Sequence, residues 1–463
     1  MSQRNLKAVP NPLDKTHEGT PAKHLSAMEE LRRTVMACLL WEDQFYESGE
    51  GLAERVAELV NQINGADVAE LAIEAREKMK LRHMPLYLAR LLAAKGYNVE
   101  DLLYRIIQRP DELTEFLALY GRKDRKPPLA ASVKRGLARA FTKFNAYSLA
   151  KYNRATEIKL RDVLFLCHAK PKDDEQAATW KLLVENNLPT PDTWETELSA
   201  GKDKRATWER LIIENKLGAL ALLRNLRNME SVSVNRDLIK TALKNMPVER
   251  VLPFRFISAA RYAPSLESDI EQAMFRCLEG IPKLPGKTAL VIDTSPSMWG
   301  TKVSDRSEMD RFEAAAALAI LCRELCSDVR IYAFNSESYD IPDRRGFGLR
   351  DALATSKGSH SRGGLAVAKA NKDGYDRIVV LTDGQWHYSS MSGGEKFGEA
   401  VVASPAPLTK CAYMINVAGY KRAVGYGKWT QIDGWSESVM SYIAANEFGA
   451  NANVGEVYDE NTD

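Results

Sequence analysis

The spacing of the apolar residues changes once along this chain, near residue 281, and this change constrains the fold more than any other feature. Before it, apolar residues recur at helical spacing, as Leu31, Val35 and Leu39 do within residues 28–46. After it, short apolar runs alternate with helical segments. No run approaches the roughly 20 apolar residues that a membrane-spanning helix needs. The sequence therefore predicts a helical part followed by an α/β part, with no membrane partner.

The helical part is predicted as many helices of modest length separated by Gly, Pro and Asn. They are expected over residues 28–46, 51–63, 70–94, 98–110, 110–123, 132–144, 160–168, 192–200, 207–229, 236–246 and 265–278. This pattern favours stacked antiparallel pairs of the HEAT type, an α-solenoid, with a globular all-α bundle as the alternative. Residues 1–24 are rich in Pro, Asn and Thr without a period and are predicted to form an extended arm. The helical domain is predicted over residues 25–285.

Residues 286–463 are predicted to form one doubly wound α/β domain. Residues 281–286, IPKLPG, form the expected linker before it. Strands are predicted at residues 288–292, 329–334, 377–381 and 411–417, and helices at 311–325 and from Gly363 onward. Strands that alternate with helices indicate a parallel sheet covered on both faces.

Basic residues concentrate in one segment of an otherwise balanced chain. Residues 121–172 carry 14 Lys and Arg against three Asp and Glu, a net charge of +11, whereas the whole chain carries +2. A local excess of this size indicates an anionic partner such as nucleic acid, although a solvated helix face produces the same pattern.

Oxygen-bearing side chains follow two of the predicted strands. Residues 293–297 read Asp-Thr-Ser-Pro-Ser, and Asp383 follows the strand at 377–381. Ligands of open α/β sheets bind at the carboxyl ends of the strands, and Mg²⁺ prefers oxygen ligands. A third loop, residues 359–364, supplies further hydroxyls. The pattern predicts a divalent cation site, although a capped turn is the alternative for residues 293–297 alone.

This constellation resembles the metal-ion-dependent adhesion site of von Willebrand factor A domains. The resemblance implies that a divalent cation, Mg²⁺, binds at Asp293, Ser295, Ser297, Ser361 and Asp383. Ser361 stands where the family has Thr, which keeps the oxygen but loses a methyl group. Pro296 replaces a small residue and fixes φ near −65°.

Several blocks of the helical part resemble the TROVE module of the Ro autoantigen family, in its bacterial or phage form. They are the segments 39–46 (LLWEDQFY), 79–85 (MKLRHMP), 149–154 (LAKYNR), 160–171 (LRDVLFLCHAKP) and 217–229 (LGALALLRNLRNM). A von Willebrand A domain follows in the order that the family has. The resemblance implies a ring of HEAT-like repeats closed by that domain.

The resemblance also implies a function in RNA quality control or degradation. Family members bind small structured Y RNA on an outer basic surface and accept single-stranded 3′ ends of misfolded RNA in a central hole. Bacterial members are associated with a 3′-to-5′ exoribonuclease. Cations at helical spacing agree with phosphate binding. The predicted RNA-binding residues are Lys134, Arg135, Arg139, Lys143, Lys151, Arg154, Lys159, Arg161, His168 and Lys170, of which His168 matches a family position that contacts RNA.

Other aromatic and basic residues have weaker interpretations. Trp41, Phe45 and Tyr46 could stack on bases, but their helical spacing favours core packing. Arg82 and His83 are candidates for the inner wall of the ring. His360 and His387 are interpreted as structural residues.

The predicted function is therefore that of an RNA-binding protein without catalytic activity. One alternative is an adhesion or assembly module, in which the metal binds a partner's carboxylate. The other is a metal-dependent hydrolase built on Asp293 and Asp383, for which the sequence offers no clear general base. Six cysteines without a CxxC pair and an N-terminus without an apolar core predict a cytoplasmic protein.

Overall fold

A computed structural model of the chain gives the fold. It describes the residues 26–37, 49–77, 79, 81–121, 128–154, 156–248, 251, 253–279, 283–303, 309–386, 407–409, 411–418, 429–434 and 438–448. The predicted arm over residues 1–24 and the side chains of Trp41, Phe45, Tyr46 and His387 lie outside this set.

The described residues fall into two compact units. The first, the helical unit, lies within Ala53–Leu217 and Asn228–Ile239; the second, the sheet-containing unit, lies within Met1–Leu52, Gly218–Arg227 and Lys240–Asp463. The domain boundary expected near residue 286 stays a prediction. The described residues up to 279 are helical almost throughout, and those from 283 onward combine strands with helices, so the predicted fold class of helical repeats followed by an α/β domain is confirmed.

The helices before the sheet are short and closely spaced. They are α1 (Ala27–Ala37), α2 (Gly49–Gln62), α3 (Gly65–Glu77), α4 (His83–Ala94), α5 (Glu100–Ile106), α6 (Pro110–Tyr120), α7 (Ala131–Phe141), α8 (Ala146–Tyr152), α9 (Leu160–Cys167), α10 (Asp174–Val184), α11 (Trp194–Ser199), α12 (Lys204–Ile213), α13 (Ala219–Ser231), α14 (Arg236–Asn245), α15 (Pro253–Tyr262) and α16 (Glu267–Arg276), with the 3₁₀ turn η1 (Pro264–Leu266) before α16.

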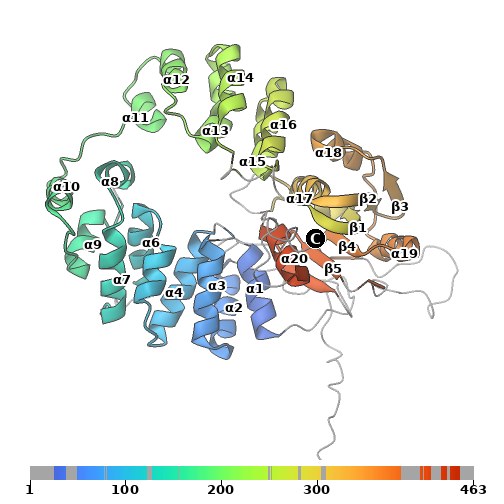
Figure 1. The fold of residues 1–463 in the computed structure, drawn as a ribbon, viewed down its shortest axis with the longest axis horizontal. Coiled ribbons are helices and arrows are strands. Elements are labelled where there is room, and N and C mark those ends of the chain that lie inside the picture. Colours follow the sequence, from blue (N-terminus) through green and yellow to red (C-terminus); the bar gives the residue numbers. More distant parts are fainter. Residues whose placement is uncertain are drawn as a thin grey trace, which may run out of the picture. The chain divides into compact units, whose positions relative to one another are not determined.

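The helical unit is built from two rows of stacked helices (Figure 1). In one row α3 packs on α5, α5 on α7 and α7 on α9; in the other α4 packs on α6 and α6 on α8. The two rows also contact each other, because α3 packs on α4, α4 on α5 and α6 on α7. This is the arrangement of α-solenoids, in which each repeat buries its apolar face against the next.

One buried ion pair joins three helices of this unit. The Arg76 guanidinium on α3 contacts the Glu112 carboxylate on α6 at 2.6 Å and donates to the carbonyl of Ile106, at the end of α5, at 2.8 Å. Glu112 also accepts hydrogen bonds from the backbone N–H groups of Gln108 and Arg109, which lie just before α6. Every charge at this junction is therefore partnered, as burial requires.

Two of the predicted helices are interrupted. Residues 207–229 form α12 and α13 because Asn215 adopts a left-handed conformation (φ 50°) that ends α12. The Lys216 N–H then bonds to the Leu211 carbonyl, a C-terminal capping pattern. Residues 70–94 divide between α3 and α4, and Pro85 lies in the first turn of α4, where it needs no hydrogen-bond partner.

Within the part of the chain that the structure describes, the sheet has six strands in the order β3-β2-β1-β4-β5-β6. They are β1 (Leu284–Asp293), β2 (Cys326–Phe334), β3 (Ser338–Ile341), β4 (Arg377–Thr382), β5 (Cys411–Asn416) and β6 (Thr430–Asp433). The associated helices are η2 (Pro296–Met298), α17 (Arg311–Leu325), α18 (Gly346–Ala354), α19 (Gly363–Asp373) and α20 (Ser438–Phe448). The helix predicted at residues 311–325 is confirmed with the same bounds.

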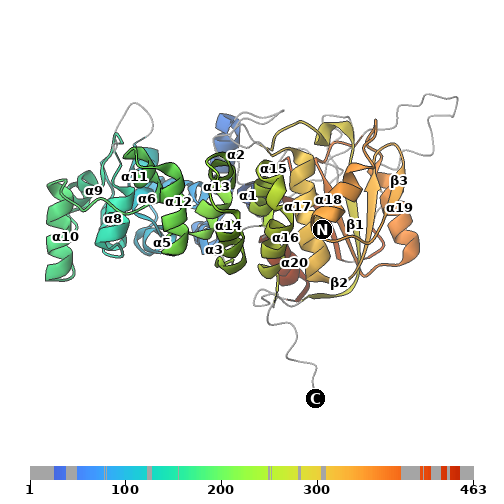
Figure 2. The same ribbon diagram turned by 90° about the horizontal axis from the view of Figure 1, so that it is seen from above.

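Helices α17 and α19 lie on opposite faces of the sheet (Figure 2). Ala366, Val367 and Ala370 of α19 belong to the core cluster that contains Val291 of β1 and Val380 of β4. Helix α17 packs on β1, β2 and β4. Apolar side chains on both faces explain why the central strands appear in the sequence as continuous apolar runs.

The sheet departs from the predictions in three places. Strand β3 pairs with β2 in the antiparallel direction, because a short turn after Phe334 returns the chain along the edge. The linker predicted at residues 281–286 is partly strand, since Leu284 already pairs with Cys326 of β2. Strand β6, at the other edge, was not predicted; it extends the parallel part of the sheet.

A second buried ion pair attaches the last described helix to the sheet. Arg377 of β4 binds Glu447 of α20, and their side chains are 3% and 7% exposed. Arg377 also donates to the Thr288 hydroxyl at 2.9 Å and to the Pro285 carbonyl at 3.2 Å.

We expect Arg377→Met to lower the free energy of unfolding of this unit by about 3–5 kcal/mol, because it leaves the Glu447 charge buried without a partner. The double variant Arg377→Met/Glu447→Leu should recover most of the loss. Urea unfolding followed by tryptophan fluorescence measures both. A double variant as unstable as the single one would show that packing, and not the charge, is responsible.

Candidate functional site

The predicted carboxylates meet at the carboxyl edge of the sheet. Strands β1 and β4 are parallel neighbours, and Ile292 of β1 pairs with Leu381 of β4. Asp293 ends β1, and Asp383 follows β4 by one residue. Both side chains are fully buried. The two acids therefore lie next to each other because of the strand register.

Hydroxyl and amide groups surround Asp293. The Ser361 and Thr382 hydroxyls donate to its Oδ2 at 3.1 Å and 2.7 Å, and the Ser295 backbone N–H donates to its Oδ1 at 2.9 Å. The hydroxyls of Ser295 and Ser297 lie 3.4 Å apart. The structure thus brings together the predicted set of Asp293, Ser295, Ser297, Ser361 and Asp383, with Ser361 at the place expected for it.

Arg311 and Thr382 also belong to the site, and sequence reasoning did not find them. Arg311 begins α17, is 4% exposed, and donates from Nη1 to Asp383 Oδ2 at 3.1 Å. The same Nη1 lies 3.4 Å from the Ser297 carbonyl oxygen. Thr382 carries a signal, because it precedes Asp383 directly. Arg311 carries none, since its partner is 72 residues away in the chain.

The two carboxylates differ in their electrostatic surroundings. Burial and the neighbouring Asp383 raise the pKa of Asp293 to about 7. Asp383 pairs with Arg311 and accepts the Gln385 backbone N–H at 3.1 Å. The guanidinium of Arg311 already neutralises Asp383. A bound metal ion would favour the ionised form of Asp293.

The donor set fits a hard divalent cation. Asp293, Ser295, Ser297 and Ser361 offer only oxygen, the ligand type of Mg²⁺. Pro296 is accommodated in the 3₁₀ turn η2, which brings the Ser297 hydroxyl back toward Ser295. The described residues contain no group of three or more His, Cys, Asp or Glu side chains that could hold a metal. A metal at this site would therefore need the three serine hydroxyls as ligands.

The predicted RNA-binding residues lie on α7, α8 and α9 of the helical unit, in the loops between these helices, and just after α9. Two of them are already paired: Arg135 with Glu100 at 2.5 Å, and Arg139 with Asp101 of the same helix, α5. Lys143 contacts the Tyr104 carbonyl, and desolvation lowers its pKa to about 8.

The remaining cations of this set have fewer acidic neighbours. Among the residues that the structure describes, no carboxylate partner is found for Lys134, Lys151, Arg154, Lys159 and Lys170. Arg161 lies 3.9 Å from Asp162, and His168 is exposed, with a left-handed backbone (φ 50°) that ends α9. We refer to the five unpaired cations as the basic surface.

Aromatic side chains contact some of the predicted RNA-binding cations or lie exposed on α8 and α9. Arg139 and Lys143 lie over the ring of Tyr104 at 4.2 Å and 4.6 Å, and Phe165 of α9 and Tyr147 of α8 are 61% and 54% exposed. Sequence reasoning did not single them out. Their exposure to solvent suggests a binding role, and helical spacing in the sequence could not reveal it.

The weaker candidates take structural positions. Arg82 binds Asp111 at 2.7 Å and Glu115, both on α6. His83 lies 3.8 Å from the second carboxylate oxygen of Glu115. These contacts join α4 to α6, so the guanidinium of Arg82 serves the stacking of the repeats.

The fold and the sheet-edge cluster define a class: a helical-repeat protein with a doubly wound α/β domain that carries carboxylates and hydroxyls at its edge. Residues 184–279 match the TROVE domain. This match confirms the resemblance to the TROVE module that was predicted from the sequence.

Known proteins support this assignment. The chain is 29% identical over 152 residues to telomerase protein component 1 of Mus musculus, and 34% identical over 89 residues to that of Rattus norvegicus. These matches cover 27% and 18% of this chain but only 6% and 3% of those much longer proteins. The solved structure of the Ro (RSR) protein of Deinococcus radiodurans aligns with a TM-score of 0.59 and 18% identity, over 91% of this chain and 99% of that one, and so shares its fold.

None of the described helices has the length and apolar character that crossing a membrane requires.

The raised pKa of Asp293 predicts a pH dependence in metal-free buffer. A carboxyl group with an unfolded pKa of about 4 and a folded pKa near 7 binds more protons when folded. Its contribution to stability is therefore present at low pH and is lost as the pH rises from about 4 to 7, by at most about 1.4 kcal/mol per pH unit.

We expect wild type to lose stability relative to Asp293→Asn as the pH is raised from 5 to 7.5 in EDTA. Urea midpoints at each pH measure the difference. Parallel curves for the two proteins would show that Asp293 is ionised throughout this range.

Proposed function

We propose that this protein binds RNA through the basic surface of its helical unit. The observation that carries the proposal is a set of unpaired cations, with exposed aromatic side chains on α8 and α9 of the same segment, on a chain whose whole charge is nearly balanced. Cations bind phosphates regardless of sequence, and exposed rings stack on unpaired bases. The TROVE match supports the same interpretation.

The finer part of the proposal concerns the kind of RNA. We propose that a small structured, Y-like RNA binds on the basic surface and that single-stranded 3′ ends of misfolded RNA enter a central hole. A-form helices are recognised through their backbone and shape, whereas unpaired ends expose their bases. A role in RNA quality control, together with a 3′-to-5′ exoribonuclease, follows from this proposal and from the family resemblance.

We also propose that a divalent cation, Mg²⁺, binds at Asp293, Ser295, Ser297, Ser361 and Asp383, as in a metal-ion-dependent adhesion site. The support is the convergence of oxygen ligands on a fully buried carboxylate. A bound cation would stabilise the carboxyl edge of the sheet and offer an open position to a partner's carboxylate. Through this open position the α/β domain would bind a protein partner, as a second function alongside RNA binding.

A hydrolase remains the less favoured alternative. Asp383 is held by Arg311 and Asp293 by hydroxyl donors, so neither carboxylate is arranged as a free base or nucleophile. We propose that the protein has no catalytic activity of its own, and Mg²⁺-dependent cleavage of RNA that is lost in Asp293→Ala would contradict this.

Binding of structured RNA should depend on salt through the basic surface. Each phosphate contact adds roughly 0.7–0.9 to the slope of log K against log salt. We expect the triple variant Lys134→Gln/Lys151→Gln/Arg154→Gln to reduce this slope by about two to three units. Filter binding of a blunt RNA hairpin at several salt concentrations measures it.

A matched control removes three exposed cations of the α/β domain that also lack a carboxylate partner among the described residues: Lys287→Gln/Arg330→Gln/Lys372→Gln. It should leave the slope unchanged. Replacing Arg135 and Arg139 by Gln should have less effect than removing two unpaired cations, because Glu100 and Asp101 already neutralise them. Equal slopes for the first triple variant and wild type would exclude the basic surface.

The proposed cation should stabilise the folded protein by mass action. We expect millimolar Mg²⁺ to raise the thermal unfolding midpoint of wild type but not that of Asp293→Ala. Asp328→Ala, which removes an exposed carboxylate of β2, is the control and should respond as wild type does. If the Mg²⁺ effect survives in Asp293→Ala, the ion binds elsewhere; if wild type shows no effect, the proposal is wrong.

A further inference from the structure

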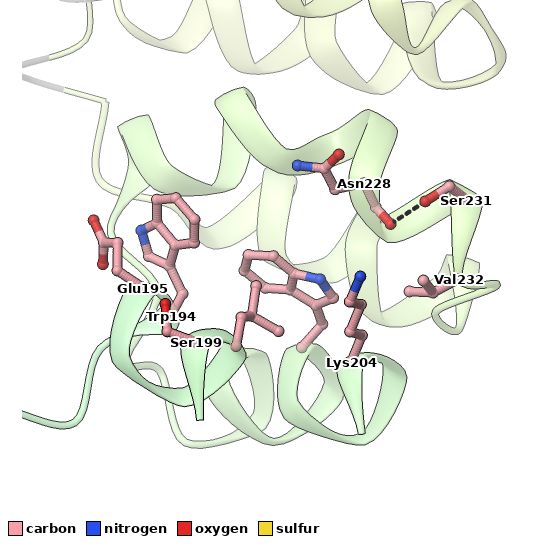
Figure 3. Close-up of a pocket in the computed structure, with 9 residues that line it drawn as sticks. Trp194, Glu195, Ser199, Lys204, Asn228, Ser231 and Val232 are labelled. Atoms are coloured by element: carbon pink, nitrogen blue, oxygen red, sulfur yellow. Dashed lines mark hydrogen bonds between the residues drawn. The ribbon is translucent and has the colours of Figure 1, made fainter. Parts of the chain in front are cut away.

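A pocket of about 460 Å³ lies among α11, α12 and α13 in the helical unit. Trp194 and Glu195 of α11 line it together with Lys204 of α12, and Asn228 and Ser231 of α13 contribute the remaining polar rim (Figure 3). Its volume is within the usual range for small-molecule sites. It falls inside the segment that matches the TROVE domain. None of the predicted RNA-binding residues lines it.

The apolar wall of the pocket is aromatic. The rings of Trp194 and Trp208 are stacked, with centroids 5.8 Å apart and an angle of 25° between their planes. Trp208 is 1% exposed and fixed in the core, whereas Trp194 is only partly covered. The indole surface of Trp194 is therefore the part of the pair that a flat ligand could cover.

Ion pairs hold this wall in place before any ligand arrives. Asp192, two residues before Trp194, contacts Arg210 at 2.9 Å and Lys216 at 2.7 Å. These partners lower the pKa of Asp192, so it stays ionised. The Thr193 hydroxyl accepts the Thr196 N–H and caps α11. A wall with its position set in advance loses less conformational entropy on binding.

The charge of the pocket favours an anion at one side. Two neighbours of Lys204 are ion-paired, Lys202 with Glu197 at 2.7 Å and Arg205 with Glu209 at 3.0 Å. Lys204 is exposed and has no carboxylate partner among the described residues. Its ammonium lies on the side of the pocket that carries Asn228 and Ser231, away from Trp194 (Figure 3).

We propose that this pocket holds one unstacked base of a single-stranded RNA against Trp194, with the adjoining phosphate on Lys204. A ring surface and an unpaired cation at opposite sides of one pocket match the flat base and the charged backbone of a nucleotide. The positive charge of Lys204 would repel a lysine or arginine side chain of a peptide ligand at this position. The Glu195 carboxylate and the Asn228 amide can accept or donate hydrogen bonds to base edges. The inference rests on the proposed RNA-binding function and assigns a site for unpaired RNA to it.

The test uses the full-length protein and a fluorescein-labelled 12-nucleotide oligouridylate, with a blunt RNA hairpin as the structured probe. Anisotropy gives both affinities. Stacking on one base contributes about 1–3 kcal/mol, so Trp194→Ala should weaken oligouridylate binding about 5- to 150-fold. Hairpin binding should stay within twofold of wild type. Trp194→Phe, which keeps a ring and guards against misfolding, should retain most of the oligouridylate affinity.

Two further variants locate the phosphate and control for surface change. Lys204→Gln should lower the salt slope for oligouridylate by about 0.7, the value for one phosphate of a single strand, and leave the hairpin slope unchanged. Tyr339→Ala removes an exposed aromatic of the α/β domain and should change neither affinity.

The outcomes separate the two levels of the proposal. If wild type binds the hairpin and Trp194→Ala binds oligouridylate as wild type does, the pocket is not a base site and the RNA-binding function stands. If oligouridylate fails to bind but a peptide with an aromatic residue does, the pocket is a protein site. If wild type binds neither RNA, the proposed function and this inference both fall.

Discussion

The burial of two carboxylates at adjacent strand ends is the constraint on which the α/β domain depends. Parallel pairing of β1 and β4 places Asp293 and Asp383 together, and neither side chain reaches solvent. Two like charges in a buried site need partners, and each acid receives different ones: hydroxyls for Asp293, a guanidinium for Asp383. Because Arg311 begins α17, neutralising Asp383 also anchors that helix to the sheet edge. The same demand for partners makes Asp293 suitable for a metal ion.

In the helical unit, ion pairing removes charge that would otherwise be available to a ligand. Arg76, Arg82 and Arg139 bind carboxylates on neighbouring helices, so their charge is used in stacking the repeats. The net charge of +11 over residues 121–172 therefore overstates what remains available to a ligand. Cations such as Lys151 and Arg154, which have no such neighbour among the described residues, carry the local excess.

Much of the fold could be predicted from the sequence, because apolar spacing reports local structure. The helix at residues 311–325 and the strand beginning at Arg377 follow from it directly. The cluster of Asp293 with Ser361 was predicted by combining strand ends with a family pattern. Arg311 and the Arg135–Glu100 pair could not be found this way, since their partners lie 72 and 35 residues away and depend on tertiary packing. The break at Asn215 was missed because a single left-handed residue interrupts an otherwise continuous helical pattern.

The basic surface and the tryptophan pocket belong to the same helical unit but use different physics. Phosphate contacts weaken steeply with salt, because their free energy comes largely from counterion release. Stacking on Trp194 involves no ions and should persist at high salt. A structured RNA held by charge and an unpaired end held by a ring would therefore respond differently to the same change in salt. If the proposed sites bind as we infer, this difference would let one unit hold a folded RNA while still discriminating between ends that are free and ends that are paired.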